Sequence, residues 1–410
     1  MSLKKIDILL YGSTGFTGKL VAAYLDTHPH LKNKTWAIAG RTESKLQKLK
    51  STLTSDPLVI CCPLDDDQAV TEMVKRCRVI ITCAGPYSLY SGDVLLGACA
   101  ENGVHYSDLA GEAFFQRKMI TKYHAIAQKT GAKICLGGGI DSIPSDIGAM
   151  MVLNALPSTS TDVIAIQGIY TRYCGAFSGG TINSGRAGKK ARKGVLPGYP
   201  YSNEVDKDPY VLTAGAEGIE KSTSVDPSGM QNKFSWLFDA TYGVICSFFM
   251  APINARVVRR SFVLRNEHDR ISYAEACSLF MWIHVVTVWA LRGFGYFVCD
   301  PINFSPKSGE GPPAWLLKNG QFCVEVVATN KTTGVTAKAV VAGKGDPGYG
   351  ATSKLLSELG LCLAFDDHSG SECDGGVLTP STAVGVVYVD RLKKATFMNS
   401  IEVVSGGKTE

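Results

Sequence analysis

The chain has 410 residues, with 42 basic and 37 acidic side chains and a formal net charge of +5. This length is enough for two domains and a large core, and so small an excess of positive charge does not favour a nucleic-acid partner. The 13 cysteines form no C-x-x-C pair, so we expect no metal site and reduced thiols in an intracellular, cytoplasmic protein.

A glycine-rich turn follows the first predicted strand. The apolar run Ile6–Tyr11 predicts a buried strand, and Lys19–Leu25 has helical spacing. Between them the glycines are spaced G-x-x-G-x-x-G. A strand that turns directly into a helix presents the first helical amides and the positive end of the helix dipole to one point, which suits a phosphate. The turn therefore predicts a dinucleotide-binding site, with a purely structural βα turn as the alternative.

Each glycine of this turn has an expected part in the site. We expect Gly12 to allow the tight turn, Gly15 to let a pyrophosphate approach the backbone, and Gly18 to let the helix lie close to the sheet. The predicted cofactor-binding residues of the turn are Gly12, Ser13, Thr14, Gly15, Phe16, Thr17 and Gly18.

Strand and helix patterns alternate through the first third of the chain, which predicts a Rossmann-type, doubly wound parallel sheet covered by helices on both faces. Ligands of such sheets bind at the carboxyl ends of the strands. The expected strands are Thr35–Ala39, Pro57–Cys61, Val79–Cys83, Val104–Asp108 and Ala132–Leu136. The expected helices are Glu43–Leu53, Asp66–Arg76, Gly92–Asn102, Glu112–Thr130 and one that starts at Pro144.

The end of the second strand indicates which nicotinamide cofactor binds. Folds that bind NAD place Asp or Glu there to bond the ribose 2′-hydroxyl, but here Arg41 and Thr42 follow the strand. A guanidinium suits a 2′-phosphate, so we expect NADP(H); a solvated loop arginine is the alternative. Asp65, after the third strand, is expected to bond the adenine amino group or to cap the next helix.

Polar residues after the fourth and sixth strands are candidates for the chemistry. We expect Cys83, Ala84, Gly85 and Pro86 to line the nicotinamide half of the cofactor. Candidate catalytic residues are Tyr87, Asp141 and Ser142. The alternatives are packing beside the cofactor for Tyr87 and helix capping for Asp141 and Asp146. Glu112 is expected to interact with the dipole of the following helix.

The pattern changes after Pro157. Thr161–Tyr170 alternates as a strand, and Gln321–Thr329 and Val335–Ala342 form a hairpin pattern. We therefore expect an NADP-binding domain at 1–155 and a second, α+β domain with a mixed or antiparallel sheet at 156–345. Helices expected within 346–398, at Tyr349–Leu363 and Thr379–Phe397, are predicted to pack back on the first domain.

Two apolar stretches and one basic segment leave alternatives open. Phe234–Ile253 and Leu279–Val298 are expected to be core helices or a surface that docks on a membrane or a lipid substrate. The segment after Gly179-Gly180-Thr181 is expected to be a mobile charged loop or to bind an anionic partner such as a phosphopantetheine, a coenzyme A ester or a lipid head group. Its basic residues are Arg186, Lys189, Lys190, Arg192 and Lys193.

Short motifs carry a family resemblance along almost the whole chain. They are Tyr11–Gly18, Trp36–Arg41, Cys83–Tyr87, Tyr106–Glu112, Ile140–Asp146, Ser178–Thr181, Ala255–Ser261, Gly309–Pro312, Gly345–Ala351 and Gly375–Pro380. With these motifs the chain resembles the saccharopine dehydrogenase-like oxidoreductases, in the branch that includes the trans-acting enoyl reductases. The resemblance implies an N-terminal Rossmann domain, a nicotinamide cofactor and a second domain that carries part of the substrate site. Enzymes of this branch reduce double bonds in lipid chains, and some relatives are linked to lipid droplets and membranes.

Three functions are compatible with these observations. The first is an NADP(H)-dependent oxidoreductase acting on a double bond of an apolar, lipid-linked substrate. The second is a saccharopine-type dehydrogenase acting on an amino-acid C–N bond, for which Arg256, Arg259 and Arg260 are the available arginine cluster. The third is a non-catalytic, membrane-associated protein that binds NADPH. Candidate partners are a small-molecule or lipid-linked substrate, a peripheral membrane or lipid-droplet surface and a second copy of the chain.

Overall fold

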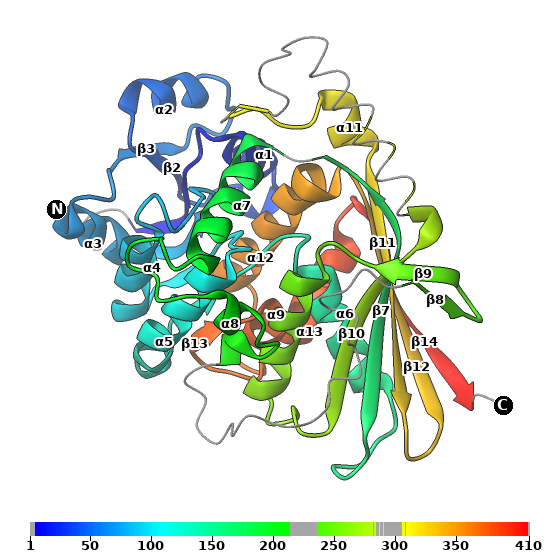
Figure 1. Cartoon of the computed structure of the whole chain (residues 1–410). Coiled ribbons are helices and arrows are strands. Elements are labelled where there is room, and N and C mark those ends of the chain that lie inside the picture. The colour runs from blue at the N-terminus through cyan, green and yellow to red at the C-terminus, as the bar shows by residue number, and fades with distance from the viewer. Residues whose placement is uncertain are drawn as a thin grey trace.

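A computed structural model describes residues 5–176, 178–213, 236–281, 283, 287, 290, 306–307 and 309–408. In this part of the chain the strands form two sheets of seven strands each, with helices packed around and between them (Figure 1). This architecture confirms the predicted fold class, a doubly wound parallel sheet joined to a second, mixed sheet.

The first sheet is parallel throughout and has the strand order β13-β6-β5-β4-β1-β2-β3. Its strands are β1 (Ile6–Tyr11), β2 (Trp36–Gly40), β3 (Leu58–Cys61), β4 (Cys77–Thr82), β5 (His105–Ser107), β6 (Lys133–Cys135) and β13 (Gly376–Leu378). Its helices are α1 (Phe16–Asp26), α2 (Glu43–Lys50), α3 (Asp67–Lys75), α4 (Gly92–Glu101), α5 (Ala113–Thr130) and α6 (Ile143–Ala155), with the short η1 (Pro29–Leu31). The strand β13 was not predicted, and it brings a C-terminal segment into the first sheet.

Helices cover both faces of this sheet. Along β1, Ile8 and Leu10 belong to one hydrophobic core, and Leu9 and Tyr11 belong to the other. On one side α3, α4 and α5 pack next to one another, whereas α12 (Thr352–Phe365) packs on α1 and across β1, β4 and β5. The buried, apolar strands follow from this double coverage.

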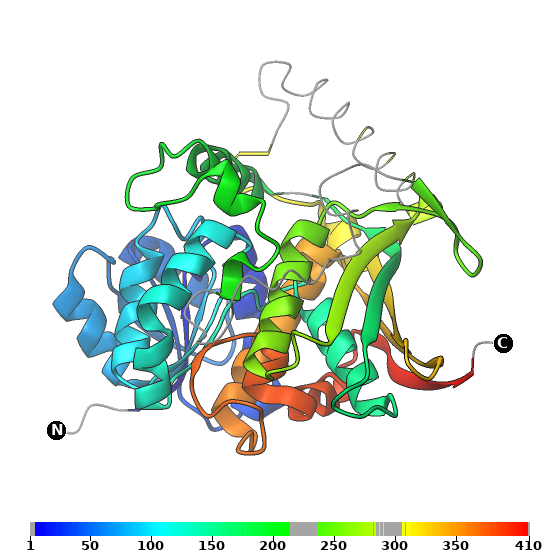
Figure 2. The same ribbon diagram turned by 60° about the horizontal axis from the view of Figure 1, so that its bottom comes forward.

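The second sheet is mixed and has the order β14-β12-β11-β7-β10-β9-β8, in which β7 and β10 are the parallel pair. Its strands are β7 (Ile164–Cys174), β8 (Trp236–Asp239), β9 (Gly243–Ser247), β10 (Ile271–Ser278), β11 (Gln321–Asn330), β12 (Val335–Lys344) and β14 (Met398–Lys408). Between the sheets lie α6, α9 (Ala251–Leu264), α12 and α13 (Pro380–Lys394), as Figure 2 shows from a second direction. One hydrophobic core runs from β1 to β11 through this helical layer. The domain boundaries at 155 and 345 stay a prediction.

Two segments differ from their expected structure. The basic segment is not a mobile loop, because Gly179–Arg192 forms the helix α7, followed by α8 (Asn203–Asp206) and η2 (Val211–Thr213). The stretch Phe234–Ile253 is not a core helix in its described residues: β8 and β9 form a hairpin there, and α9 begins at Ala251.

Most of the second apolar stretch, Leu279–Val298, lies outside the described residues. Among the helices that the structure describes, none combines the length and the apolar character needed to span a bilayer. Two further short elements complete the chain: α11 (Ala314–Asn319) and the turn η4 (Pro347–Ala351), which lies just before α12.

Candidate active site

The turn between β1 and α1 has the predicted geometry. Gly12 has a φ of +73°, and a Cβ at this position would lie 2.7 Å from the amide nitrogen of Ala84. A Cβ on Gly18 would overlap the carbonyl oxygen of Gly12, so the helix can approach the turn only without a side chain there. Gly15 caps α1 in an extended conformation, and Lys19 donates to its carbonyl oxygen at 3.0 Å. The amides of Phe16, Thr17 and Gly18, the first of α1, therefore have no acceptor within the helix and are available to a phosphate.

The other predicted residues of the turn have distinct surroundings. Ser13 is buried and its Oγ donates to the carbonyl oxygen of Ala39 at 3.2 Å, so its side chain fixes the turn to β2. The Phe16 ring meets the Tyr349 ring edge to face, with 5.3 Å between the ring centroids. Thr17 lines the large cavity described below, and Thr14 is half-buried.

The ends of β2 and β3 carry the predicted adenosine-side residues. Arg41 is exposed, and its guanidinium lies 5.4 Å from the centroid of the Tyr90 ring. Thr42 caps α2, and the Glu43 carboxylate accepts from the Gln47 amide at 2.7 Å. Asp65 is exposed and does not cap α3, because Asp66 fills that position by accepting from the Ala69 amide at 2.9 Å. A free guanidinium where NAD enzymes have a carboxylate fits a 2′-phosphate.

A cavity of about 720 Å³ opens at the carboxyl ends of the first sheet's strands. It begins at the glycine turn and the β4 end and extends beneath α7 to the start of α9. The predicted residues that line it are Thr17, Cys83, Gly85, Tyr87 and Asp141. Ala84 and Pro86 are neighbours of lining residues, and Pro86 is buried. This volume is within the range of small-molecule sites.

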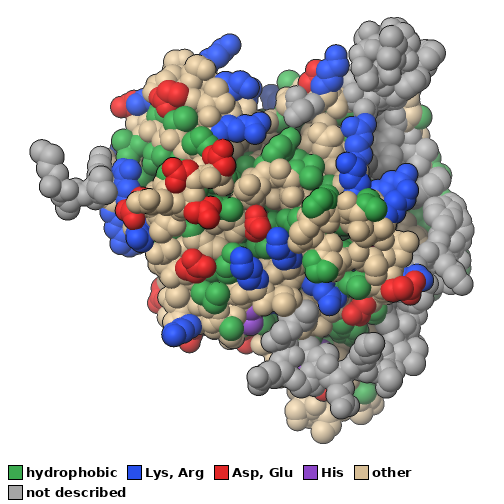
Figure 3. Space-filling view, turned by 60° about the vertical axis from the view of Figure 1, so that its left-hand side comes forward, with side chains coloured by type: hydrophobic (Ala, Val, Ile, Leu, Met, Phe, Trp, Pro, Cys, Tyr) green, Lys and Arg blue, Asp and Glu red, His purple; other side chains and the backbone are tan. Residues whose placement is uncertain are grey.

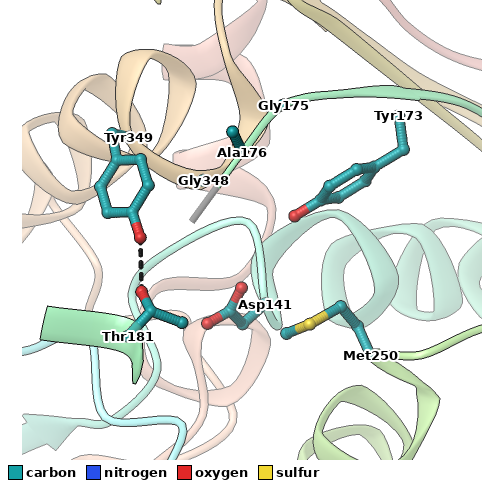
Figure 4. A pocket seen from close by; sticks show the side chains of 8 residues that line it. All are labelled: Asp141, Tyr173, Gly175, Ala176, Thr181, Met250, Gly348 and Tyr349. Carbon is teal, nitrogen blue, oxygen red and sulfur yellow. Dashed lines mark hydrogen bonds between the residues drawn. The ribbon is translucent and has the colours of Figure 1, made fainter. Parts of the chain in front are cut away.

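Asp141 is the carboxyl group that faces this cavity after β6. It also borders an adjoining cavity of about 60 Å³ with Tyr173, Thr181, Met250 and Tyr349, where its carboxyl group points into the space between these side chains (Figure 4). Among the described residues, it has no hydrogen-bond or ion-pair partner. Burial raises the pKa of Asp141 to about 6, which is the range in which a carboxyl group can donate and regain a proton near neutral pH. It does not cap α6.

The hydroxyl of Tyr87 is held by the backbone on two sides. It donates to the carbonyl oxygen of Thr82 at 3.0 Å and accepts from the amide of Leu109 at 3.0 Å. Burial raises the pKa of Tyr87 well above its ordinary value. Ser142 is fully buried, and it lines neither of the two cavities described here.

Two other acidic residues make contacts that the sequence did not predict. Glu112 precedes α5, and its carboxylate accepts from the amides of Tyr87 and Ser88 at 3.1 and 3.2 Å and from the Ser184 hydroxyl at 3.0 Å. It thereby joins the β4 loop to α7. Asp146 does not cap α6: it accepts from the Ser381 amide at 2.7 Å and holds the start of α13.

The basic residues divide into cavity-lining and distant groups. Of the basic residues predicted on α7, Arg192 lines the cavity, and Arg256 of α9 lines it too. Arg259 and Arg260 are buried and donate to the carbonyl oxygens of Tyr273 and Leu212. The proposed arginine cluster is therefore divided, with a single member at the cavity.

Tyr349 is a site residue that the sequence analysis missed. Its hydroxyl accepts from the Ser178 amide at 2.7 Å and bonds the Thr181 hydroxyl, so it holds the start of α7 while its ring packs on Phe16. The Gly345–Ala351 motif was its one available signal, and that motif carries no chemistry that points to α7.

The chain is similar to several known proteins. The family model of the saccharopine dehydrogenase NADP binding domain matches residues 8–135. Trans-acting enoyl reductases of Mycobacterium tuberculosis and Mycobacterium leprae are each 32% identical, over 416 and 413 residues, with 96% of both chains covered. Another Mycobacterium tuberculosis relative is 33% identical over 413 residues, again with 96% of both chains covered. Saccharopine dehydrogenase (L-Glu forming) from Saccharomyces cerevisiae covers 97% of this chain and 99% of its own, at 11% identity and a TM-score of 0.49.

These matches define an NADP-dependent oxidoreductase whose cofactor is NADP(H). The chain belongs to the family of the trans-acting enoyl reductases, because the similarity extends over nearly the whole of each relative. The residues present fit the cofactor: the turn leaves no room for a Cβ at Gly12 or Gly18, and the first amides of α1 face outward from the strand end.

Proposed function

We propose that this protein transfers a hydride from NADPH to a carbon–carbon double bond in an apolar, lipid-linked substrate. The observation that carries the proposal is the unpaired Asp141 carboxyl group in a cavity that is continuous with the glycine turn. Apolar side chains form much of the remaining wall, namely Phe114, Ile182, Phe249, Met250 and Ile253. The relatives named trans-acting enoyl reductases support the same reaction.

The chain's own contribution to this reaction is to position the substrate, exclude water and deliver a proton. Bound NADPH supplies the hydride. Addition of hydride to the β-carbon of a double bond conjugated to a carbonyl leaves the α-carbon to be protonated. We assign that proton to the Asp141 carboxyl group, which then takes a new proton from solvent. Tyr87, with its hydroxyl held by two backbone groups, shapes the cavity wall beside the cofactor.

The arrangement of arginines supports this reaction over the saccharopine-type alternative. A substrate with several carboxylates needs guanidinium groups that face the cavity. Arg259 and Arg260 instead satisfy backbone carbonyl oxygens in the protein interior, so only Arg256 of the predicted cluster lines the cavity.

The test of the proposed function is NADPH consumption with a panel of substrates. We expect loss of NADPH absorbance with medium- and long-chain enoyl thioesters, together with a saturated product detected by mass spectrometry. Turnover with α-ketoglutarate and lysine, and none with the thioesters, would establish the C–N alternative instead. Tight NADPH binding without turnover on either panel would favour the non-catalytic function.

We also propose that the protein associates with a membrane or lipid-droplet surface through a hairpin patch, which consists of Phe238, Val244, Phe280 and Ile283. Phe238 and Val244 pair across the β8–β9 hairpin, and Phe280 follows β10 on the other side of β9. Phe238 and Phe280 are each 80% exposed. Such a group of exposed apolar side chains is typical of an interaction surface.

Flotation with phospholipid vesicles tests this part of the proposal. We expect the protein to float with the vesicles and the double variant Phe238→Glu, Phe280→Glu to stay in the bottom fraction. Trp315→Glu is the matched control, because Trp315 is also exposed but lies on α11. Equal flotation of all three proteins would contradict the patch.

A further inference from the structure

One face of α7 lies along the cavity from end to end. Its cavity-lining residues include Thr181, Ser184, Gly185, Gly188 and Arg192. These positions recur every three or four residues, so they share one side of the helix. The first four are small and leave space between α7 and the opposite wall, whereas the last is a long cation at the C-terminal end of the helix. Figure 1 shows α7 running from beside α1 toward α8.

The N-terminal end of this face lies at the proposed reaction centre. The Thr181 hydroxyl bonds the Tyr349 hydroxyl, and both residues border the 60 Å³ cavity together with Asp141 (Figure 4). A helix rises about 1.5 Å per residue, so Arg192 lies about 16 Å along the axis from Thr181. The cavity therefore connects a proton donor at one end with a guanidinium at the other.

Two arginines surround one carboxylate at this far end. Arg256 Nη1 lies 3.2 Å from Asp206 Oδ1, and Tyr201 donates to the same oxygen at 2.8 Å. Arg192 Nη1 is 4.0 Å from Asp206 Oδ2, which is too long for a hydrogen bond. The Arg192 side chain is 45% exposed and the Arg256 side chain 12%. Of the described residues that line the cavity at this end, the two guanidinium groups outnumber the one carboxylate.

The cations that line this end of the cavity are Arg192 and Arg256. On the face shown in Figure 3, basic and acidic side chains of the described residues are intermixed, and no wide basic surface is visible. A planar guanidinium with several N–H donors matches the oxygens of a phosphate group.

We infer that Arg192, assisted by Arg256, forms an anion subsite that binds a phosphate of the substrate at the opposite end of the cavity from the reacting bond. The inference rests on the proposed function for the end at which reduction occurs. The substrate is then an unsaturated acyl group joined through a linker to a phosphate ester. A phosphopantetheine-type thioester and a phospholipid share this chemistry, and the small residues of α7 leave space for the linker in the cavity.

Titration calorimetry on the NADP⁺-bound protein tests the subsite without turnover. The probes are pantetheine 4′-phosphate against pantetheine, and dioctanoyl phosphatidic acid against dioctanoylglycerol. We expect Arg192→Ala to weaken binding of a phosphate-bearing probe about 10- to 100-fold, the range for a hydrogen bond to a charged group. Binding of its phosphate-free partner should not change, and Arg192→Lys should restore part of the affinity.

The matched control is Lys193→Ala, which removes a neighbouring exposed cation that does not line the cavity. The phosphate probe whose affinity depends on Arg192 identifies the source of the anion. The subsite is refuted if neither phosphate probe responds to Arg192→Ala, or if Lys193→Ala weakens binding equally. A third outcome is that phosphate binding depends on Arg192 but no enoyl substrate is reduced. This outcome would support the subsite and contradict the proposed reaction, so failure of one proposal can be distinguished from failure of the other.

Discussion

The glycine turn and the cavity beneath α7 form one continuous site, but they are built in different ways. The turn uses one short segment, Gly12–Gly18, and we propose that it binds the cofactor through backbone amides, which need only glycines in the right places. The cavity is assembled from segments more than a hundred residues apart, and its chemistry depends on side chains such as Asp141 and Arg192. The comparison implies that cofactor affinity and turnover can be altered separately.

The largest expected effect is in the cavity. Asp141→Asn should lower kcat with an enoyl substrate by about 10²- to 10⁴-fold, the usual contribution of a positioned acid. The affinity for NADPH, measured by fluorescence titration, should stay unchanged because Asp141 lies outside the turn. Asp67→Asn, an exposed carboxylate on α3, is the control. A full kcat in Asp141→Asn would remove this residue from the chemistry.

A substitution in the turn should instead lower the affinity for NADPH. Gly18→Ala places a Cβ against the Gly12 carbonyl oxygen and 2.8 Å from the Ser13 Cα. We expect NADPH binding to weaken by about 100-fold, since relieving this overlap must move the turn. Gly370→Ala, where a Cβ meets open space, is the control. A circular dichroism melt separates local loss of binding from failure to fold, and unchanged NADPH affinity in folded Gly18→Ala would contradict the geometry.

The same difference explains how much the sequence could predict. The turn, the alternating strands and helices, and Arg41 are local patterns, and the structure has them where they were expected. The helix α7 was not predicted because four glycines (Gly179, Gly180, Gly185 and Gly188) lower its helix propensity by about 1 kcal/mol each. Burial of Ala187 and Ala191 in the hydrophobic core beside the first sheet overrides that preference.

Two further errors have physical causes that can be named. The β8–β9 hairpin was predicted as a helix because its residues are mostly apolar and the turn between the two strands was not recognised. In that turn Asp239 accepts from the Thr241 and Tyr242 amides at 2.8 and 3.0 Å, and Gly243 has a φ of +67°. The Tyr349 bond to Thr181 joins residues 168 positions apart, and no periodicity encodes such a contact. Sequence patterns therefore miss site residues whose contacts are with residues far away in the sequence.

Arg41 tests cofactor discrimination within the turn region. Arg41→Ala should weaken NADPH binding by about 1.5–3 kcal/mol, the value for a hydrogen bond to a charged group, and leave NADH binding almost unchanged. Lys45→Ala, an exposed cation on α2, should change neither affinity. Equal losses for both cofactors in Arg41→Ala would contradict recognition of the 2′-phosphate.

The pH dependence of stability offers an independent test of Asp141. Its pKa is about 6 in the folded protein and about 3.9 in an unfolded chain. The folded state therefore binds the extra proton between these values, and stability falls as the pH rises through about 6. Asp141→Asn should be more stable than the original protein by about 3 kcal/mol at pH 7 and by less than about 1 kcal/mol at pH 4. The measurement is urea unfolding at both pH values, and a constant difference would contradict the raised pKa.

Tyr349 joins the two regions, and its substitution should have the smallest effect. Tyr349→Phe keeps the ring against Phe16 but leaves the Ser178 amide and the Thr181 hydroxyl without their partner. We expect the substrate KM to rise about fivefold, equivalent to about 1 kcal/mol, with NADPH affinity changed less than about twofold. Tyr242→Phe removes a hydroxyl that donates to Glu325 on the second sheet at 2.7 Å and should change neither value. If Tyr349→Phe weakened NADPH binding as much as it raised KM, cofactor binding at the turn and substrate binding in the cavity would not be separable. That result would contradict the comparison.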